Sequence, residues 1–155
     1  MKINIITVGK PGNVHYSALT AMYQKRLQRY FSLSVIHTRD VAAAKQRPQE
    51  IMRREALLLQ KKLPERGKRI VLDQHGTALS SEKFAAFLEK NRSERSTDLS
   101  FIIGGPYGLD PSIKALADIT FSLSSMTLVH ELALVVLLEQ IYRGATLMSG
   151  KKYHK

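Results

Sequence analysis

Apolar and polar residues follow one another along this chain in blocks that predict strands and helices in turn. Short runs that are rich in β-branched residues and bounded by glycine, proline or polar residues are typical of buried strands. Apolar positions spaced three and four residues apart predict helices instead. Five segments have the strand pattern: residues 2–8, 33–38, 69–73, 99–103 and 119–123.

Five further segments have helical spacing or a helix start signal, and they fill the gaps between these strands. They are residues 14–30, Pro48 to about Leu63, a helix after an N-cap at Ser80 or Ser81, residues 111–116, and about His130 to Leu147. Proline in the first turn and serine at the N-cap favour three of these starts. The first helix is expected to bury a face made of Leu19, Met22, Tyr23, Leu27 and Tyr30. The third is expected to cover Phe84, Phe87 and Leu88.

This alternation of strands and helices predicts βαβ units, in which helices connect parallel strands. Such units bury a parallel sheet between two layers of helices. We therefore expect an α/β fold, a three-layer domain with a parallel sheet. No repeat, low-complexity segment or linker interrupts the pattern, so residues 1–155 are expected to form a single domain.

The charge of the chain adds a function class to this fold. The 24 Lys and Arg residues exceed the 13 Asp and Glu residues and give a formal net charge of +11. The excess lies in residues 1–69 and 143–155, whereas residues 70–142 are net negative. Such a distribution suits a polyanion, most often nucleic acid. The predicted helix from Pro48 contributes a basic amphipathic face with Arg53, Arg54, Lys61 and Lys62.

Composition excludes several kinds of site. The chain has no cysteine, which excludes disulfides, thiolate zinc sites, iron–sulfur clusters and cysteine nucleophiles. The five histidines lack zinc-ligand spacing, so we expect no metal. The apolar N-terminal run is too short for a signal peptide, and the longest apolar run, residues 132–138, is far shorter than a membrane span. We expect a cytoplasmic protein that does not contact a membrane.

Candidate chemistry gathers where three predicted strands end, because ligands of open parallel sheets bind beyond the carboxyl ends of the strands. Unusual sequences occupy residues 72–76, 103–109 and 123–129, the last leading into His130. The glycine-rich turn at 103–109 is neither a dinucleotide-binding fingerprint nor a P-loop, and Pro106 removes one amide N–H from it. It favours either a small ligand held by backbone groups and apolar walls, or a tight turn without a ligand.

The last predicted helix carries a charged pair after its apolar run. Glu139 and Arg143 are four residues apart and share a face, either as a structural ion pair or as part of a site. The terminal residues Tyr153, His154 and Lys155 combine an aromatic ring, an imidazole and a cation. That set suits base stacking and phosphate contact, although exposed tails are usually frayed.

Several of these motifs together resemble one known family. They are residues 102–109, residues 123–127 followed by His130, residues 139–143, the ending at 153–155 and the opening at 2–10. In this order, over essentially the whole chain, they are similar to the ribosomal RNA large subunit methyltransferase H family of the SPOUT superfamily. The resemblance implies a C-terminal trefoil knot, S-adenosyl-L-methionine as cofactor, and a homodimer with its site near the subunit interface. It also implies methylation of N3 of a pseudouridine in 23S rRNA within the assembled ribosome.

Carried over position by position, the resemblance implies two sets of site residues. The cofactor pocket is expected to contain Leu72, Gly104, Gly105, Ser124, Ser125, Met126, Thr127, Leu128 and Val129. The reaction is expected to involve His130, Glu139, Arg143, Tyr153 and His154. Either Glu139 or His154 is the candidate acceptor of the N3 proton. Arg143 is the candidate group for phosphate or developing charge, and Tyr153 the candidate for stacking on a base.

Two positions depart from the family pattern. Val129 stands where the family usually has proline before the histidine, and Leu134 stands where it usually has arginine. The first departure bears on the path of the knot loop, and the second removes a charge near the site. These departures leave open a non-catalytic RNA-binding protein of SPOUT type. A SPOUT methyltransferase that acts on another RNA is a second alternative, against which the ending at 153–155 and the short chain argue. The non-catalytic protein is expected to bind RNA but little or no S-adenosylmethionine.

Overall fold

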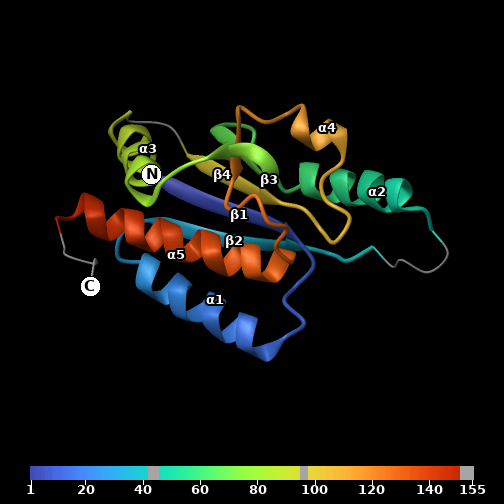
Figure 1. Ribbon diagram of the computed structural model, residues 1–155, viewed down its shortest axis with the longest axis horizontal. Coiled ribbons are helices and arrows are strands. Elements are labelled where there is room, and N and C mark those ends of the chain that lie inside the picture. The colour runs from blue at the N-terminus through green and yellow to red at the C-terminus, as the bar shows by residue number, and fades with distance from the viewer. Residues whose placement is uncertain (42–45, 95–97, 151–155) are drawn as a thin grey trace.

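Strands and helices alternate in the computed structural model, which describes residues 1–41, 46–94 and 98–150 (Figure 1). The strands are β1 (Lys2–Val8), β2 (Ser32–Thr38), β3 (Lys68–Ala78), β4 (Leu99–Ile103) and β5 (Ile119–Ser122). The helices are α1 (Val14–Leu27), α2 (Pro48–Gln60), α3 (Ser81–Ser93), α4 (Pro111–Lys114) and α5 (His130–Met148). Each predicted element is confirmed, and β1 and β4 have the predicted bounds.

The strands form one five-stranded sheet in the order β2-β1-β4-β3-β5, and every neighbouring pair is parallel. Residues of β4, the central strand, are buried throughout. Parallel strands point the same way, so their carboxyl ends share one edge of the sheet. The segments that leave the sheet after Leu72, Ile103 and Ser122 therefore start at a common edge, as the strand-end argument requires.

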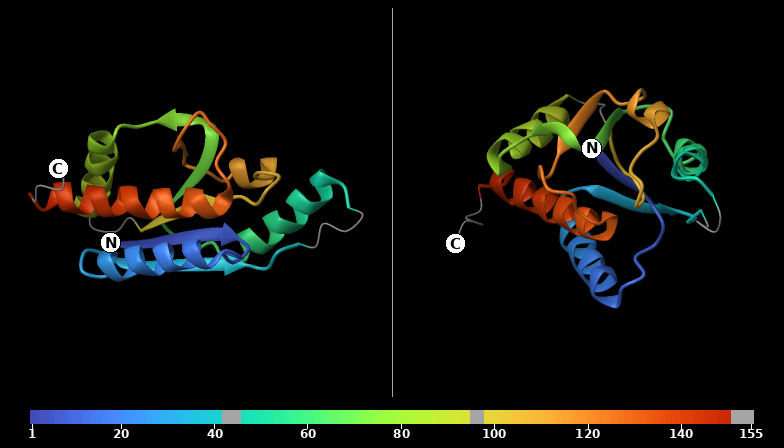
Figure 2. Two further views of the ribbon diagram at one scale, coloured as in Figure 1. Left: turned by 60° about the horizontal axis from the view of Figure 1, so that its bottom comes forward. Right: turned by 45° about the vertical axis from the view of Figure 1, so that its right-hand side comes forward.

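Helices cover both faces of the sheet and confirm the three-layer fold (Figure 2). On one face, α1, α3 and α5 pack over Ile3, Ile5 and Phe101. On the other face, α2 and α4 pack over Ile6 and Ile102. Successive side chains of β1 and β4 point to opposite faces of the sheet and therefore pack in two separate cores.

Helix α5 is the central helix of its layer, because it packs against both α1 and α3. Its apolar run is largely buried, as predicted, with Leu134, Leu137 and Leu138 in the core. Leu134 is only 1% exposed. The residue that departs from the family pattern at this position is therefore a core side chain, and its apolar character fits where it lies.

The face predicted for α1 is wrong at one position. Thr20 and Leu27 are buried and Tyr23 packs against the core, whereas Leu19 is 39% exposed. A spacing of three and four residues is shared by two neighbouring stripes of a helix, so it does not tell which of them faces the sheet. The edge strand β2 is half-buried along its middle, with Leu33 and Val35 against one core and Ile36 against the other.

Three helices, α1, α2 and α4, end two or three residues earlier than predicted. The predicted last residues instead donate their backbone N–H groups to carbonyls three residues back, in tightened turns that keep the apolar spacing. These bonds run from Tyr30 to Leu27, from Leu63 to Gln60 and from Leu116 to Ile113.

Strand β3 continues five residues beyond its predicted end, because its pairing with β5 is interrupted and then resumes. Leu72 and Thr77 both pair with Phe121, so residues 73–76 leave the ladder between them. A Cβ atom on Gly76 would lie 2.7 Å from the carbonyl carbon of Phe121 and 2.8 Å from the carbonyl oxygen of Thr120. The absence of a side chain at Gly76 therefore lets the looped-out segment return against β5.

Among the described residues, no helix has both the length and the apolar character needed to cross a bilayer. The same residues hold no group of three His, Cys, Asp or Glu side chains suited to a metal ion. The trefoil knot and the single-domain organisation stay predictions.

We predict that Gly76→Ala lowers the free energy of unfolding by about 1–3 kcal/mol, because the new methyl group must displace backbone atoms of β5. Urea denaturation of both proteins measures this difference. Gly12→Ala is the matched control, since its Cβ has its nearest neighbour 4.0 Å away, and we expect little change. Equal midpoints for wild type and Gly76→Ala would contradict the prediction.

Candidate functional site

The looped-out part of β3 and the loops after β4 and β5 meet in a groove with a volume of about 840 Å³. Helix α2 adds Met52 to its wall, and α4 adds Pro111 and Lys114. Eight of the nine predicted cofactor residues line the groove; Ser125 does not. The lining residues are Leu72, Gly104, Gly105, Ser124, Met126, Thr127, Leu128 and Val129, together with His130. The three strand ends that the sequence singled out thus form one site.

The glycine-rich turn after β4 is both a tight turn and a wall of the groove. The N–H of Gly108 donates to the carbonyl of Gly105 at 3.0 Å, and Gly108 has φ of +86°. A Cβ atom on Gly104 would lie 2.8 Å from the carbonyl carbon of Gly108. The turn closes on itself only because these positions carry no side chain, and the same lack of side chains exposes backbone to the groove.

The segment between β5 and α5 is ordered by its own hydroxyl groups. The hydroxyl of Ser122 donates to the carbonyl of Ser124, and the hydroxyl of Ser124 accepts from the N–H of Met126. The hydroxyl of Thr127 donates to the side-chain oxygen of Gln74 at 2.6 Å and so joins this segment to the looped-out part of β3. Val129, at the N-cap of α5, has φ of −62°, which is the value that proline would impose. Valine in place of the family's proline therefore keeps the same backbone path here.

The groove contains an ion pair that the sequence did not predict. Lys114 of α4 pairs with Asp73, and both residues line the groove. Asp73 also accepts a hydrogen bond from the N–H of His75 at 3.0 Å. The hydrogen bond from Lys114, followed by the one from His75, lowers the pKa of Asp73. Only the position of Asp73 at a strand end hinted at a role, and nothing in the sequence pointed to Lys114.

A buried carboxylate lies directly behind the glycine-rich turn. Glu55 of α2 is 4% exposed, and its Oε2 has no hydrogen-bond partner among the described residues. A Cβ atom on Gly105 would lie 2.8 Å from that oxygen. Burial, and to a lesser extent the charge of Asp40, raises the pKa of Glu55 to about 6. The signal in the sequence was an acidic residue at helical spacing between two apolar ones, Ile51 and Leu59.

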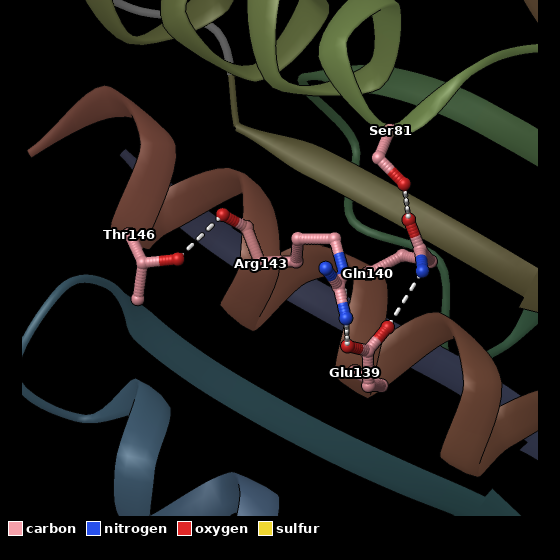
Figure 3. A network of polar contacts seen from close by, with 5 residues as sticks. All are labelled: Ser81, Glu139, Gln140, Arg143 and Thr146. Atoms are coloured by element: carbon pink, nitrogen blue, oxygen red, sulfur yellow. Dashed lines mark hydrogen bonds and ion pairs between the residues drawn. The ribbon is translucent and has the colours of Figure 1, made fainter. Parts of the chain in front are cut away.

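Glu139 and Arg143 form the predicted ion pair (Figure 3), and neither residue lines the groove. The Arg143 side chain donates to Glu139 at 2.8 and 3.0 Å, and the Gln140 amide donates to its other oxygen at 2.6 Å. Gln140 in turn accepts from the hydroxyl of Ser81 at 2.8 Å. The last residue of α5 that lines the groove is Ala133, and Glu139 lies six residues beyond it, which is about 9 Å along a helix. One chain therefore does not bring this pair to the groove.

The network of Figure 3 borders a second, smaller cavity of about 310 Å³ between α3, α5 and β5. Ser81 and Gln140 line it. Leu72 and Leu123 belong to the walls of both this cavity and the groove. The two hollows are therefore neighbours that share an apolar wall. The predicted site residues Tyr153 and His154, with Lys155, lie outside the described residues.

Comparisons with known proteins identify the family of this chain. A family described as "Predicted SPOUT methyltransferase" matches residues 1–154. A curated relative, the "Ribosomal RNA large subunit methyltransferase H" of Syntrophotalea carbinolica, is 39% identical over 154 residues, which is 99% of each chain.

Solved structures share the fold at low sequence identity. A probable methyltransferase from Bordetella pertussis has a TM-score of 0.62 at 12% identity, over 93% of this chain and 94% of that one. A putative methyltransferase from Legionella pneumophila, solved with bound cofactor SAM, has a TM-score of 0.51 at 11% identity, over 94% of this chain and 66% of that one. The likeness confirms the α/β fold of this chain.

Glu55 makes the stability of the chain depend on pH in a defined direction. Its pKa in the folded chain lies above the ordinary value of 4.5, so the folded chain binds more protons than the unfolded chain between pH 4.5 and 6. The free energy of unfolding therefore falls as pH rises through this window, by about 2 kcal/mol from this group. We predict that Glu55→Gln removes this part of the decrease, measured by urea denaturation from pH 4 to pH 8. Glu50→Gln, on the exposed side of the same helix, is the control, and a wild-type pH profile in Glu55→Gln would contradict the prediction.

Proposed function

The chain belongs to the SPOUT methyltransferase family, and from this premise we propose that it methylates N3 of a pseudouridine in 23S rRNA of the assembled ribosome. The observation that carries the proposal is the full-length likeness to a relative named as a large-subunit rRNA methyltransferase. The net charge of +11 supports a nucleic-acid substrate. A cytoplasmic location and a C-terminal trefoil knot are parts of the same proposal.

The groove fits S-adenosyl-L-methionine as the cofactor. Its volume of about 840 Å³ lies in the range of small-molecule sites. Gly104 and Gly105 offer bare backbone, Leu72 and Leu128 offer apolar walls, and Thr127 offers a hydroxyl. When bound, S-adenosyl-L-methionine supplies the methyl group from its sulfonium centre. The chain itself must hold the target base in line and take up the proton that leaves N3.

We assign proton uptake to His154 rather than to Glu139. The Glu139 carboxylate already accepts three hydrogen bonds, two from Arg143 and one from Gln140. Three of the roughly four acceptor positions of this carboxylate are therefore already taken. Glu139 and Arg143 then act as a fixed pair that positions α5 and offers its guanidinium to RNA phosphate or to charge on the base. Tyr153 stacks on the target base, and His130 faces the bound cofactor from the start of α5.

A homodimer completes this site in the proposal. Among the described residues, the three most exposed large apolar side chains are Val14, Met126 and Val129. The N–H of Gly12 donates to Glu131 at 2.6 Å, which holds the chain before α1 beside the first turn of α5. Met126 and Val129 also line the groove, so a second chain that covers this apolar surface stands next to the cofactor. Such a chain can supply the groups that lie far from the groove within one protomer.

The two departing positions no longer support the non-catalytic alternative. Val129 has the φ angle that proline would impose, and Leu134 is a core residue. No observation favours a different RNA as the target.

We predict that His154→Ala lowers the single-turnover rate of methyl transfer to ribosomes about 100- to 10,000-fold, because a general base contributes on that order. Affinity for S-adenosylmethionine stays unchanged in the same variant. Transfer of a labelled methyl group, with mapping of the modified nucleotide, measures the rate and the target together. Glu139→Gln is expected to lose less activity than His154→Ala. A wild-type rate in His154→Ala would refute the assignment.

We also predict that Gly105→Arg abolishes the heat of S-adenosylmethionine binding in a calorimetric titration. The Cβ of the new side chain would lie within 3 Å of the Glu55 carboxylate behind the turn, so the arginine must displace the turn that forms a wall of the groove. Ala86→Arg, at an exposed position on α3, is the control and binds normally. Circular dichroism shows whether each variant is folded. Equal heats for Gly105→Arg and wild type would place the cofactor elsewhere.

A further inference from the structure

We propose that the outer face of α2 binds the phosphate backbone of the RNA substrate beside the groove; this inference rests on the proposed function. The basic face of α2 is defined here as Arg53, Arg54 and Lys61, with Arg47 and Lys62 at the two ends of the helix. All five side chains are exposed. Glu50 is the acidic residue on the same exposed side, so the surface is strongly positive.

The packing of α2 restricts the class of partner. Its inner side buries Ile51, Ala56 and Leu59 against the sheet and α4. A basic amphipathic helix that binds a membrane or a protein groove does so through its apolar side. That side is already covered in the folded chain, so only the charged side is free. A polyanion is the partner that fits a charged side alone.

The residues of this face favour phosphates over bases. None of the ion pairs formed within residues 1–41, 46–94 and 98–150 uses the five cations of the basic face. Leu57 is the large apolar side chain exposed among them, and no aromatic residue lies in α2. Aromatic side chains are the usual platforms for bases, whereas Arg and Lys neutralise phosphates. The basic face therefore holds the strand without reading its sequence.

The position of α2 connects this face to the proposed chemistry. Met52 lies next to Arg53 in the sequence and lines the groove. Hydrogen bonds from Ser112, and more weakly the charge of Arg53, lower the pKa of Asp110 at the start of α4. Arg53 therefore lies near Asp110, and the next residue in the chain, Pro111, lines the groove. From Arg53 to Lys61 the helix extends about 12 Å, so a strand bound along it passes the mouth of the groove.

The test compares two double variants with equal loss of charge. Arg53→Ala with Arg54→Ala removes two cations from the basic face of α2. Lys83→Ala with Lys90→Ala removes two exposed cations from α3, on the opposite face of the sheet. Ribosome binding is measured as a function of salt, methyl transfer as KM and kcat for ribosomes, and S-adenosylmethionine binding by calorimetry.

We expect the α2 variant to bind ribosomes about 10-fold more weakly at moderate salt. The slope of the logarithm of the binding constant against the logarithm of the salt concentration becomes less steep by about 1.5. KM rises while kcat at saturating ribosomes and cofactor affinity stay unchanged. The α3 variant behaves as wild type. Equal ribosome affinity and salt slope in the two variants would overturn the proposal, and so would a loss of affinity without a change of slope. If wild type binds ribosomes but transfers no methyl group, the proposed function fails while the binding comparison still decides the role of α2.

Discussion

Burial of the parallel sheet on both faces is the constraint on which the rest of the structure depends. Parallel strands need helical connections, and those connections cover the two faces with α1, α3 and α5 on one side and α2 and α4 on the other. With both faces covered, ligands have access to the sheet chiefly at the edge where the strands end. The groove lies at that edge, and its walls come from residues 72–75, from the turn after β4 and from the segment between β5 and α5.

The two helical layers have different tasks. The layer with α5 carries the larger core and the hydrogen-bonded network of Ser81, Gln140, Glu139 and Arg143. In the other layer, the single helix α2 contributes to the groove wall, to the packing behind the glycine-rich turn and to the exposed surface. Met52 lines the groove, Glu55 lies behind Gly105, and the cations on the outer side stay exposed. A short helix thus links the proposed cofactor site to the proposed RNA contact.

The sequence predicted most of this architecture and only part of the site. β1 and β4 were predicted with their bounds because their apolar runs end at glycine, a signal that is local. The extension of β3 was missed because it depends on Thr77 meeting Phe121, a contact between distant residues. The strand-end argument and the family resemblance predicted the groove. The roles of Lys114 and Glu55 were not predicted, because they depend on contacts with Asp73 and Gly105 that form only on folding. The Glu139–Arg143 pair was predicted, but its separation from the groove depends on how α5 lies in the fold.

The strand order also shapes how the chain folds while it is synthesised. β3 pairs only with β4 and β5, both of which follow it in the sequence. Between the end of β3 at Ala78 and the end of β4 at Ile103, 25 residues must be added, which takes about 1–5 s at ordinary translation rates. During that interval β1 and β2 are already available to pair, while the apolar stretch at Ile70 and Val71 has no neighbouring strand. A nascent chain of this protein therefore exposes an unpaired, aggregation-prone strand for seconds, and chaperones that bind extended apolar segments have that time to act.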